Sequence, residues 1–432
     1  MKQNLIKIIP FIPLFSVLIL LILRPYYLSV GGGDTDFHLI RAREILMNPF
    51  YGIYWDYLTY YPVGRALWHP PLFHTVFAFL WYLVGVRFAN TIFVFTQIIL
   101  TVIIASWIGK REYGVMAGFF AGMFSLTVPR VDILTVALPA NFIPILATLT
   151  IYFLPKDQFK AFLASLIGVW THSVGLIIFI PLFLVDGARK NWKYILLLLP
   201  SVLFWGWYFI SFSGQSGVIE SAYPLFYIIP TIQIFSLILI GLFGSIGLYF
   251  LYKMDNKRFK LIIAYIVIVM VSGYTDISRG FEYAALPLAI MSGLAVSRIY
   301  GIIKIKKKFL SNYFILILVL LSFIGISPFF SIVENTNANW DDLNIPINGY
   351  AELGDYITSN SNQSEIIWAD PSSADKIVWL TGMRVSNGRY GAPKNFVEEH
   401  QKINIYTINN TFYINNENNE TIKKIDSKYV LF

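Results

Sequence analysis

Two carboxylates and an imidazole stand within five residues of the segment Gly31 to Arg41, which reads GGGDTDFHLIR. Asp34, Asp36 and His38 are residue types that bind divalent cations, because hard ions such as Mg²⁺ and Mn²⁺ favour oxygen ligands. The three glycines in front allow the backbone to turn sharply and to approach a ligand. The segment therefore predicts either a divalent cation site or a solvated polar loop.

Two later segments carry residues that could complete such a site. The first, Tyr60 to Phe73, reads YYPVGRALWHPPLF and combines prolines, a glycine and dense aromatic rings. It predicts a rigid elbow suited to lipid headgroups or to sugar, since aromatic faces serve both. The second, Gly214 to Pro224, carries a single acid, Glu220. We expect Glu220 either to be solvated or to close over a site that the first loop builds.

Apolar runs surround these segments and must position them. The 432 residues are 56% hydrophobic and only 13% charged, whereas soluble domains carry roughly 25% charge. The first run, 5–23, is followed by Arg24 rather than by a small-residue cleavage site, so we expect a retained span. Further runs lie at 88–109, 113–129, 132–154, 160–171, 174–186, 193–212, 224–251, 259–275, 281–301 and 309–332. The run 69–86 opens on His-Pro-Pro and is expected to be re-entrant or interfacial. The pattern predicts a polytopic α-helical membrane protein with roughly 11 to 13 transmembrane helices.

The basic residues lie in short loops between the runs, where they set orientation. If these loops are cytoplasmic, the loops 24–68, 129–132, 213–223 and 275–280 and the tail all face the exterior. We therefore expect an integral protein of the cell membrane whose site and C-terminal region face outward. The net charge of +8 is explained by these loops, so nucleic acid is not an expected partner. With no cysteine in the chain, thiol chemistry and disulfides are excluded.

The sequence changes character after residue 332. Residues 333–432 are polar and rich in asparagine, with strand-like patches at 365–368, 376–380 and 403–406. We therefore predict a transmembrane domain over 1–332, with exterior catalytic loops, and a small exterior α/β domain over 333–432.

Taken in chain order, five segments resemble the catalytic subunit of oligosaccharyltransferase, within the GT-C superfamily of membrane glycosyltransferases that use polyprenyl-linked sugars. The acid and histidine of that family's first exterior motif match Asp34 and His38 at the same spacing. The most specific element is His69-Pro-Pro-Leu-Phe73. The remaining similarities are Gly217-Val-Ile-Glu220, the Arg279 to Pro287 segment, and the stretch from Trp368 to Val385. The resemblance implies a GT-C-like fold.

The resemblance also implies roles for nine residues. Asp34 and Glu220 would be catalytic and would bind Mn²⁺ or Mg²⁺ with Asp36 and His38; Arg279, His69 and Arg41 would bind the donor phosphate; Trp368 and Asp370 would bind the acceptor. More ordinary roles stay open for several of them. Asp36 could instead support Asp34, Arg279 could pair with a nearby acid, each histidine could cap a helix, and Trp368 and Asp370 could be strand-end residues.

These features predict a transferase that moves sugar or oligosaccharide from a polyprenyl-(di)phosphate donor to an exterior acceptor, protein asparagine among the candidates. The expected partners are this donor, a protein or glycan acceptor and membrane lipid. A catalytically silent relative that binds or scaffolds lipid-linked glycans is the alternative, because the family's second acidic motif is missing near 134–142. A lipid-glycan transporter is disfavoured, since the spans carry few polar residues.

Overall fold

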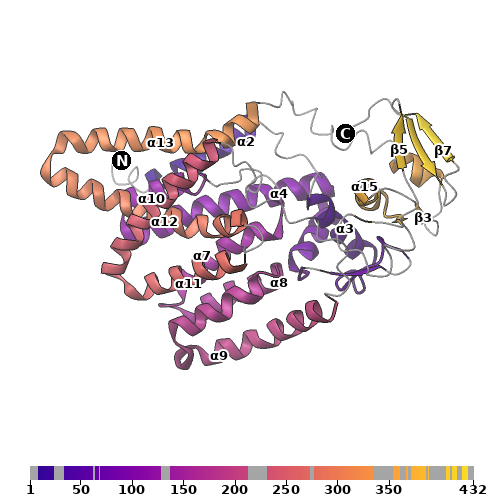
Figure 1. Ribbon diagram of the computed structural model, residues 1–432, viewed down its shortest axis with the longest axis horizontal. Helices are drawn as coiled ribbons and strands as arrows, with labels where there is room; N and C mark the ends of the chain where they lie inside the picture. Colours follow the sequence, from indigo (N-terminus) through magenta and orange to yellow (C-terminus); the bar gives the residue numbers. More distant parts are fainter. Residues whose placement is uncertain are drawn as a thin grey trace. The chain divides into compact units, whose positions relative to one another are not determined.

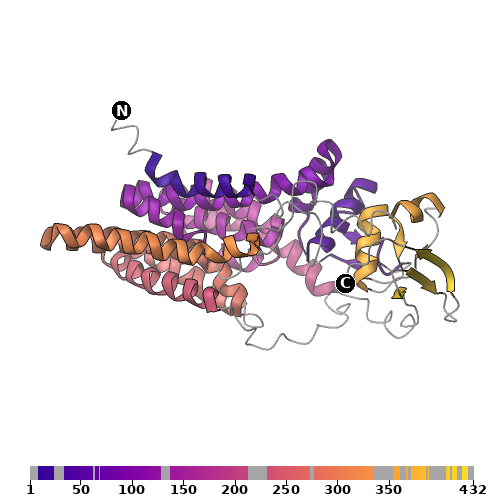
Figure 2. The same cartoon turned by 90° about the horizontal axis from the view of Figure 1, so that it is seen from above.

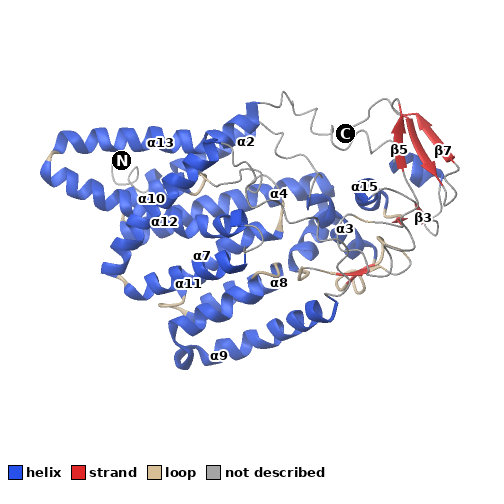
Figure 3. Cartoon of the chain, in the orientation of Figure 1, coloured by secondary structure: helices blue, strands red, loops and turns tan. Residues whose placement is uncertain are grey.

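Long apolar helices account for most of the chain, and the described strands are short (Figure 3). Contacts divide the chain into two units: 1–27, 94–202 and 223–337 form the first, and 28–93, 203–222 and 338–432 form the second. The computed structural model describes residues 8–23, 34–61, 64–67, 69–127, 137–212, 231–272, 277–334, 354–360, 366–367, 371–385, 388, 405–408, 411–415 and 421–426.

The first unit is a bundle of helices that lie side by side in both views (Figures 1 and 2). Helix α12 packs against α5, α7, α10, α11 and α13. The described elements of this unit, two of which continue into the other unit's ranges, are η1 (Ile9–Phe11), α2 (Ile12–Leu23), α4 (Leu72–Tyr113), α5 (Val115–Phe124), η3 (Pro139–Asn141), α7 (Phe142–Phe153), α8 (Gln158–Thr171), α9 (Gly175–Phe212), α10 (Thr231–Met254), α11 (Asn256–Ser272), α12 (Ile277–Lys306) and α13 (Lys308–Glu334).

Glycines allow two of these helix pairs to approach backbone to backbone. A Cβ added at Gly247 of α10 would lie 1.9 Å from the carbonyl oxygen of Met291 on α12. One added at Gly293 of α12 would lie 2.3 Å from the carbonyl oxygen of Ala117 on α5. Small residues at such crossings give membrane helices their closest contacts, because lipid supplies no hydrophobic force between them. These two contacts therefore fix α12 between α5 and α10.

Substitution of Gly247 by leucine is expected to separate α10 from α12 and to abolish most of the folded protein, because the obstruction is backbone that cannot move aside. Gly241 lies on the same helix, and a Cβ added there would have no atom of the described residues within 4 Å, so G241L is the matched control. The yield of monodisperse protein in size-exclusion chromatography measures the effect. Equal yields from the two variants would show that this close contact does not hold the bundle.

Several described helices match the predicted apolar runs. Three are long and apolar enough to cross a bilayer: Leu72–Tyr113, Gly175–Ser211 and Gly280–Lys306. Shorter apolar helices occur at 9–19, 115–124, 139–153, 238–254 and 309–322. The runs 69–86 and 88–109 fall largely within α4, which is interrupted at Gly85, where φ is 82°. The runs 174–186 and 193–212 likewise fall within α9, which is interrupted at Gly187.

The second unit combines helices with short strands. Helix α3 (Asp34–Met47) packs against α15 (Pro371–Thr381). Strands β1 (Trp55–Asp56) and β2 (Arg65–Ala66) form an antiparallel pair, and β3 (Ile366–Ile367) pairs with β4 (Arg384–Val385) in parallel. Strands β5 (Ile405–Ile408), β6 (Thr411–Asn415) and β7 (Thr421–Asp426) form an antiparallel sheet. The predicted domain boundary at 332 stays a prediction.

Two local expectations about this unit were wrong. Residues 376–380, predicted as a strand, belong to helix α15. Asp34, Asp36 and His38, predicted to lie in a loop, belong to helix α3, which begins at Asp34. An aspartate in the first turn suits a helix start, because it complements the partial positive charge of the N-terminal amides.

Candidate functional site

Helix α3 buries polar side chains of a kind that are mostly exposed in proteins. Asp36, His38, Arg41 and Glu44 are all at most 7% exposed. Charged residues are almost never fully buried unless they are paired. The partners of each therefore show what the helix positions.

Three histidines gather where α3 meets the start of α4. Nδ1 of His38 lies 2.9 Å from Nε2 of His74, and the two rings are stacked. The ring of His69 lies 5.5 Å from that of His38, centroid to centroid. A hydrogen bond between two imidazoles fixes the tautomer and the orientation of both rings. The structure thus brings together His38 and His69, which sequence reasoning selected, and adds His74, to which it gave no role.

Asp36 links α3 to the C-terminal part of the chain. The indole Nε1 of Trp379, on α15, donates a hydrogen bond of 3.0 Å to Oδ1 of Asp36. The two residues are 343 positions apart in the sequence. This contact gives Asp36 a structural partner, and both roles open for Asp36, support of Asp34 and direct metal binding, stay predictions.

Arg41 and Glu44 fasten the loop that follows α3. Nη2 of Arg41 donates to the carbonyl of Gly52, and Nη1 pairs with Glu44. Glu44 in turn accepts hydrogen bonds from the backbone amides of Tyr57, at 2.9 Å, and Leu58, at 3.2 Å. Burial lowers the pKa of Arg41 to about 10, despite the neighbouring charge of Asp56. Arg41 therefore already has protein partners, and its predicted role in phosphate binding stays a prediction.

A second buried ion pair, missed by sequence reasoning, bridges strands β1 and β2. Nε of Arg65 donates to Oδ2 of Asp56 at 2.6 Å, and Thr59 donates to both oxygens of the same carboxylate. The two partners stand opposite one another in the strand register, as cross-strand pairs of opposite charge do. Gly64, with a φ of +69°, makes the turn between them possible, since a Cβ there would lie 2.4 Å from the carbonyl oxygen of Asp56.

The other predicted site residues are not tested. Asp34 is the first residue of α3 and Arg279 lies in the first turn of α12, but their side chains fall outside what the structure describes. Glu220, Trp368 and Asp370 also lie outside the described residues.

The described residues do not by themselves form a metal site. No group of three His, Cys, Asp or Glu side chains suited to a metal ion occurs among them. The two predicted ligands that are described, Asp36 and His38, contact Trp379 and His74. Since the side chains of Asp34 and Glu220 are outside the described set, a divalent cation stays a prediction.

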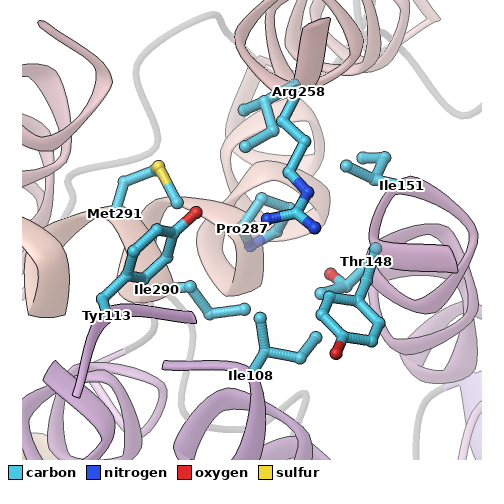
Figure 4. Close-up of a pocket in the computed structure, with 10 residues that line it drawn as sticks. Ile108, Tyr113, Thr148, Ile151, Arg258, Pro287, Ile290 and Met291 are labelled. Atoms are coloured by element: carbon cyan, nitrogen blue, oxygen red, sulfur yellow. The ribbon is translucent and has the colours of Figure 1, made fainter. Parts of the chain in front are cut away.

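A separate pocket lies within the first unit (Figure 4). Ten residues line it, and Arg258 points into it from α11. Nη1 of Arg258 is bound to Glu112 at 2.6 Å, and the same carboxylate accepts from Lys156 at 2.6 Å. Thr148, also in the lining, has a buried hydroxyl that has no hydrogen-bond partner in the described part of the chain. Most of the lining is apolar, with Ile108, Ile151, Ile262, Pro287, Ile290 and Met291 among its ten residues, and the paired guanidinium has little charge left for an anion.

The fold is that of polytopic GT-C membrane proteins, and the predicted fold class is confirmed. The crystal structure of ArnT from Cupriavidus metallidurans in the apo state has a TM-score of 0.51 and 13% identity, covering 86% of this chain and 84% of that one. The same protein bound to undecaprenyl phosphate has a TM-score of 0.52 and 12% identity, covering 89% and 84%. The resemblance drawn from the motifs is therefore confirmed at the level of the fold.

A weaker likeness extends to the Archaeoglobus fulgidus oligosaccharyltransferase in its apo form. Its TM-score is 0.48 with 11% identity, covering 84% of this chain and 61% of that one. Neither a protein-family model nor a curated protein matches the sequence.

Proposed function

We propose that this protein is a membrane glycosyltransferase that transfers sugar or oligosaccharide from a polyprenyl-(di)phosphate donor to an acceptor at the exterior face. The observation that carries the proposal is the shared fold with a structure solved with undecaprenyl phosphate bound, over 89% of this chain. The motif resemblance around Asp34 and His69 supports the same conclusion. The acceptor in this proposal is a protein or a glycan, and an asparagine side chain of a protein is one candidate.

In this proposal the site residues share three tasks: they bind the donor phosphate, the cation and the acceptor. Arg279, His69 and Arg41 bind the donor phosphate, since guanidinium donors suit phosphate oxygens. Asp34 and Glu220, with Asp36 and His38 beside them, bind Mn²⁺ or Mg²⁺. When bound, the ion would neutralise charge on the phosphate leaving group.

Trp368 and Asp370 contact the acceptor. His74 and Trp379, which hold His38 and Asp36, orient the first helix of the site.

The test is transfer by the purified protein in lipid, with undecaprenyl phosphate carrying one hexose as donor. Sequon peptides, lipids and monosaccharides are offered separately as acceptors, first with Mn²⁺ and then with chelator. We expect product with Mn²⁺ and at least a tenfold loss with chelator, because several kcal/mol of charge stabilisation would be withdrawn. Undecaprenyl phosphate without sugar is the control donor.

The outcomes separate the candidate functions. Transfer to the sequon peptide identifies an oligosaccharyltransferase activity, and transfer to another acceptor identifies a different member of the superfamily. Donor binding without product would favour the silent relative, for which the missing acidic motif near 134–142 is the sequence argument. If the protein neither binds the donor nor forms product, the proposal is contradicted.

A further inference from the structure

Arg65 has unused hydrogen-bond donors in the interior of the second unit. The side chain is 1% exposed, and its Nε is bound to Asp56. Nη1 and Nη2 are both buried and have no hydrogen-bond partner among the residues that the structure describes. A buried donor without a partner destabilises the folded protein, and more so when it carries charge. Folded proteins retain such a group rarely, so the two nitrogens are expected to have a ligand in the working state.

Two aromatic rings hold the guanidinium in place. The guanidinium carbon Cζ of Arg65 lies 5.1 Å from the ring centroid of Phe37 and 5.2 Å from that of Tyr60. With Nε bound to Asp56 as well, the orientation of the two free nitrogens is fixed before any ligand arrives. Preorganisation of this kind reduces the entropy lost on binding.

Tyr60 is also a strained residue. Its φ is +51°, a backbone conformation that a bulky side chain rarely adopts. The phenol donates a hydrogen bond to the carbonyl of Gly388, which holds the ring against Arg65. Strain of this kind persists only where the surroundings enforce it, and it is common at ligand-binding positions. Tyr60 therefore covers Arg65 in a strained backbone conformation, and a movement of Tyr60 away from Arg65 would relieve this strain.

The charges around Arg65 indicate which ligand fits. Burial alone would lower the pKa of Arg65, but Asp56 first, and then Tyr60 and Asp375, raise it. Asp375 is itself 1% exposed. Because the negative charges of Asp56 and Asp375 both act on this one guanidinium, a further anion would be repelled. Neutral oxygen acceptors do not meet this repulsion, and the hydroxyls of a sugar are such acceptors.

We propose that Arg65, Asp56, Phe37, Tyr60 and Asp375, here called the Arg65 cage, form a sugar-binding subsite in which Nη1 and Nη2 of Arg65 donate to hydroxyl oxygens of the donor's sugar after Tyr60 moves aside. This inference rests on the proposed function, because it takes the sugar from the lipid-linked donor. It assigns to the cage the recognition of the sugar and leaves the phosphate to other residues. Arg65 is thus a residue for sugar specificity.

The test measures binding of two probes to Arg65→Lys: undecaprenyl phosphate alone, and undecaprenyl phosphate carrying one hexose. Lysine keeps the charge that Asp56 needs but cannot present the two further nitrogens. We expect about a tenfold loss of affinity for the hexose-bearing lipid, as for one charge-assisted hydrogen bond or more, and no change for the bare lipid phosphate. Arg43→Lys is the matched control, because Arg43 is a partly buried arginine of α3 outside the cage.

Each outcome decides between the two proposals. If the wild type binds neither probe, the proposed function fails. If the wild type prefers the hexose-bearing lipid and Arg65→Lys keeps that preference, the cage does not read the sugar. Equal losses for both probes would assign Arg65 to the phosphate and overturn the inference.

A measurement on the wild type alone covers the case in which the variant does not fold. Hexose donors that lack one hydroxyl at a time are compared with the full sugar. At least one is expected to bind about tenfold more weakly, because the two nitrogens of Arg65 lose an acceptor. Equal affinity for all of them would overturn the inference.

Discussion

Replacing Asp56 with asparagine is expected to destabilise the second unit by about 3 to 5 kcal/mol, because it removes the hydrogen-bonded counter-charge of the buried Arg65 guanidinium. Asparagine preserves the size of the side chain, so lost packing contributes little. Thermal unfolding of the purified protein in detergent, followed by tryptophan fluorescence, measures the change. Asp157→Asn is the control, since its pair with Lys160 is exposed and such pairs contribute little. Equal melting temperatures for the two variants would contradict a structural role for the Asp56 pair.

The pH dependence of this effect follows from the same pair. Burial by itself would raise the pKa of Asp56, but the charges of Arg65 and then Arg41 outweigh it and hold the pKa below its ordinary value. A carboxyl group with a lowered folded-state pKa stabilises the protein above its unfolded pKa and stops doing so as the pH falls through the folded value. The difference in melting temperature between wild type and D56N is therefore expected to be the same at pH 8 and pH 5. A difference that vanishes by pH 5 would show that the pKa is not lowered.

The transmembrane part of the fold could be predicted because bilayer length and apolar composition leave a strong local signal. The sequence of the C-terminal region, residues 333–432, carries a weaker local signal. Residues 376–380 contain Ile, Val and Trp, which favour strands, yet they lie in α15. The periodicity of a longer window carries the better signal: Ala374, Ile377, Val378 and Thr381 are buried at the spacing of a helix face. Pro371 at the start of that helix is a further cue.

The candidate site could be predicted only where chemistry is local. Asp36 and His38 stand out because they neighbour one another in the sequence. The partners that orient them do not, since Trp379 reaches Asp36 across 343 residues and His74 reaches His38 across 36. Such pairs follow from tertiary packing, which no local pattern encodes. The pair of Asp56 and Arg65 could have been predicted from the sequence, because the segment from Tyr60 to Gly64 between them favours a hairpin turn. Such a hairpin places the two residues opposite one another.

The largest effect on activity is expected from Asp34→Ala and Glu220→Ala, each of which should lower transfer by about 10³-fold or more. Under the proposed function both carboxylates bind the divalent cation, and loss of a ligand withdraws several kcal/mol of stabilisation from the leaving phosphate. Asp34 begins α3, one helical turn before His38, so it is carried on the same helix as the buried histidine pair. Glu220 lies in the segment that follows α9.

The experiment separates loss of chemistry from loss of folding or of donor binding. Transfer, donor binding and melting temperature are measured for both variants, with Asp157→Ala as a control acid on an exposed helix start. We expect both variants to keep their melting temperature and their affinity for bare undecaprenyl phosphate, while product formation is lost and the Mn²⁺ concentration needed for any residual transfer rises. A fall in transfer with unchanged Mn²⁺ dependence would remove the residue from the metal site while keeping it catalytic. Undiminished product from both variants would contradict the roles proposed for Asp34 and Glu220 together, because no cation site built on these two carboxylates would survive the loss of either one.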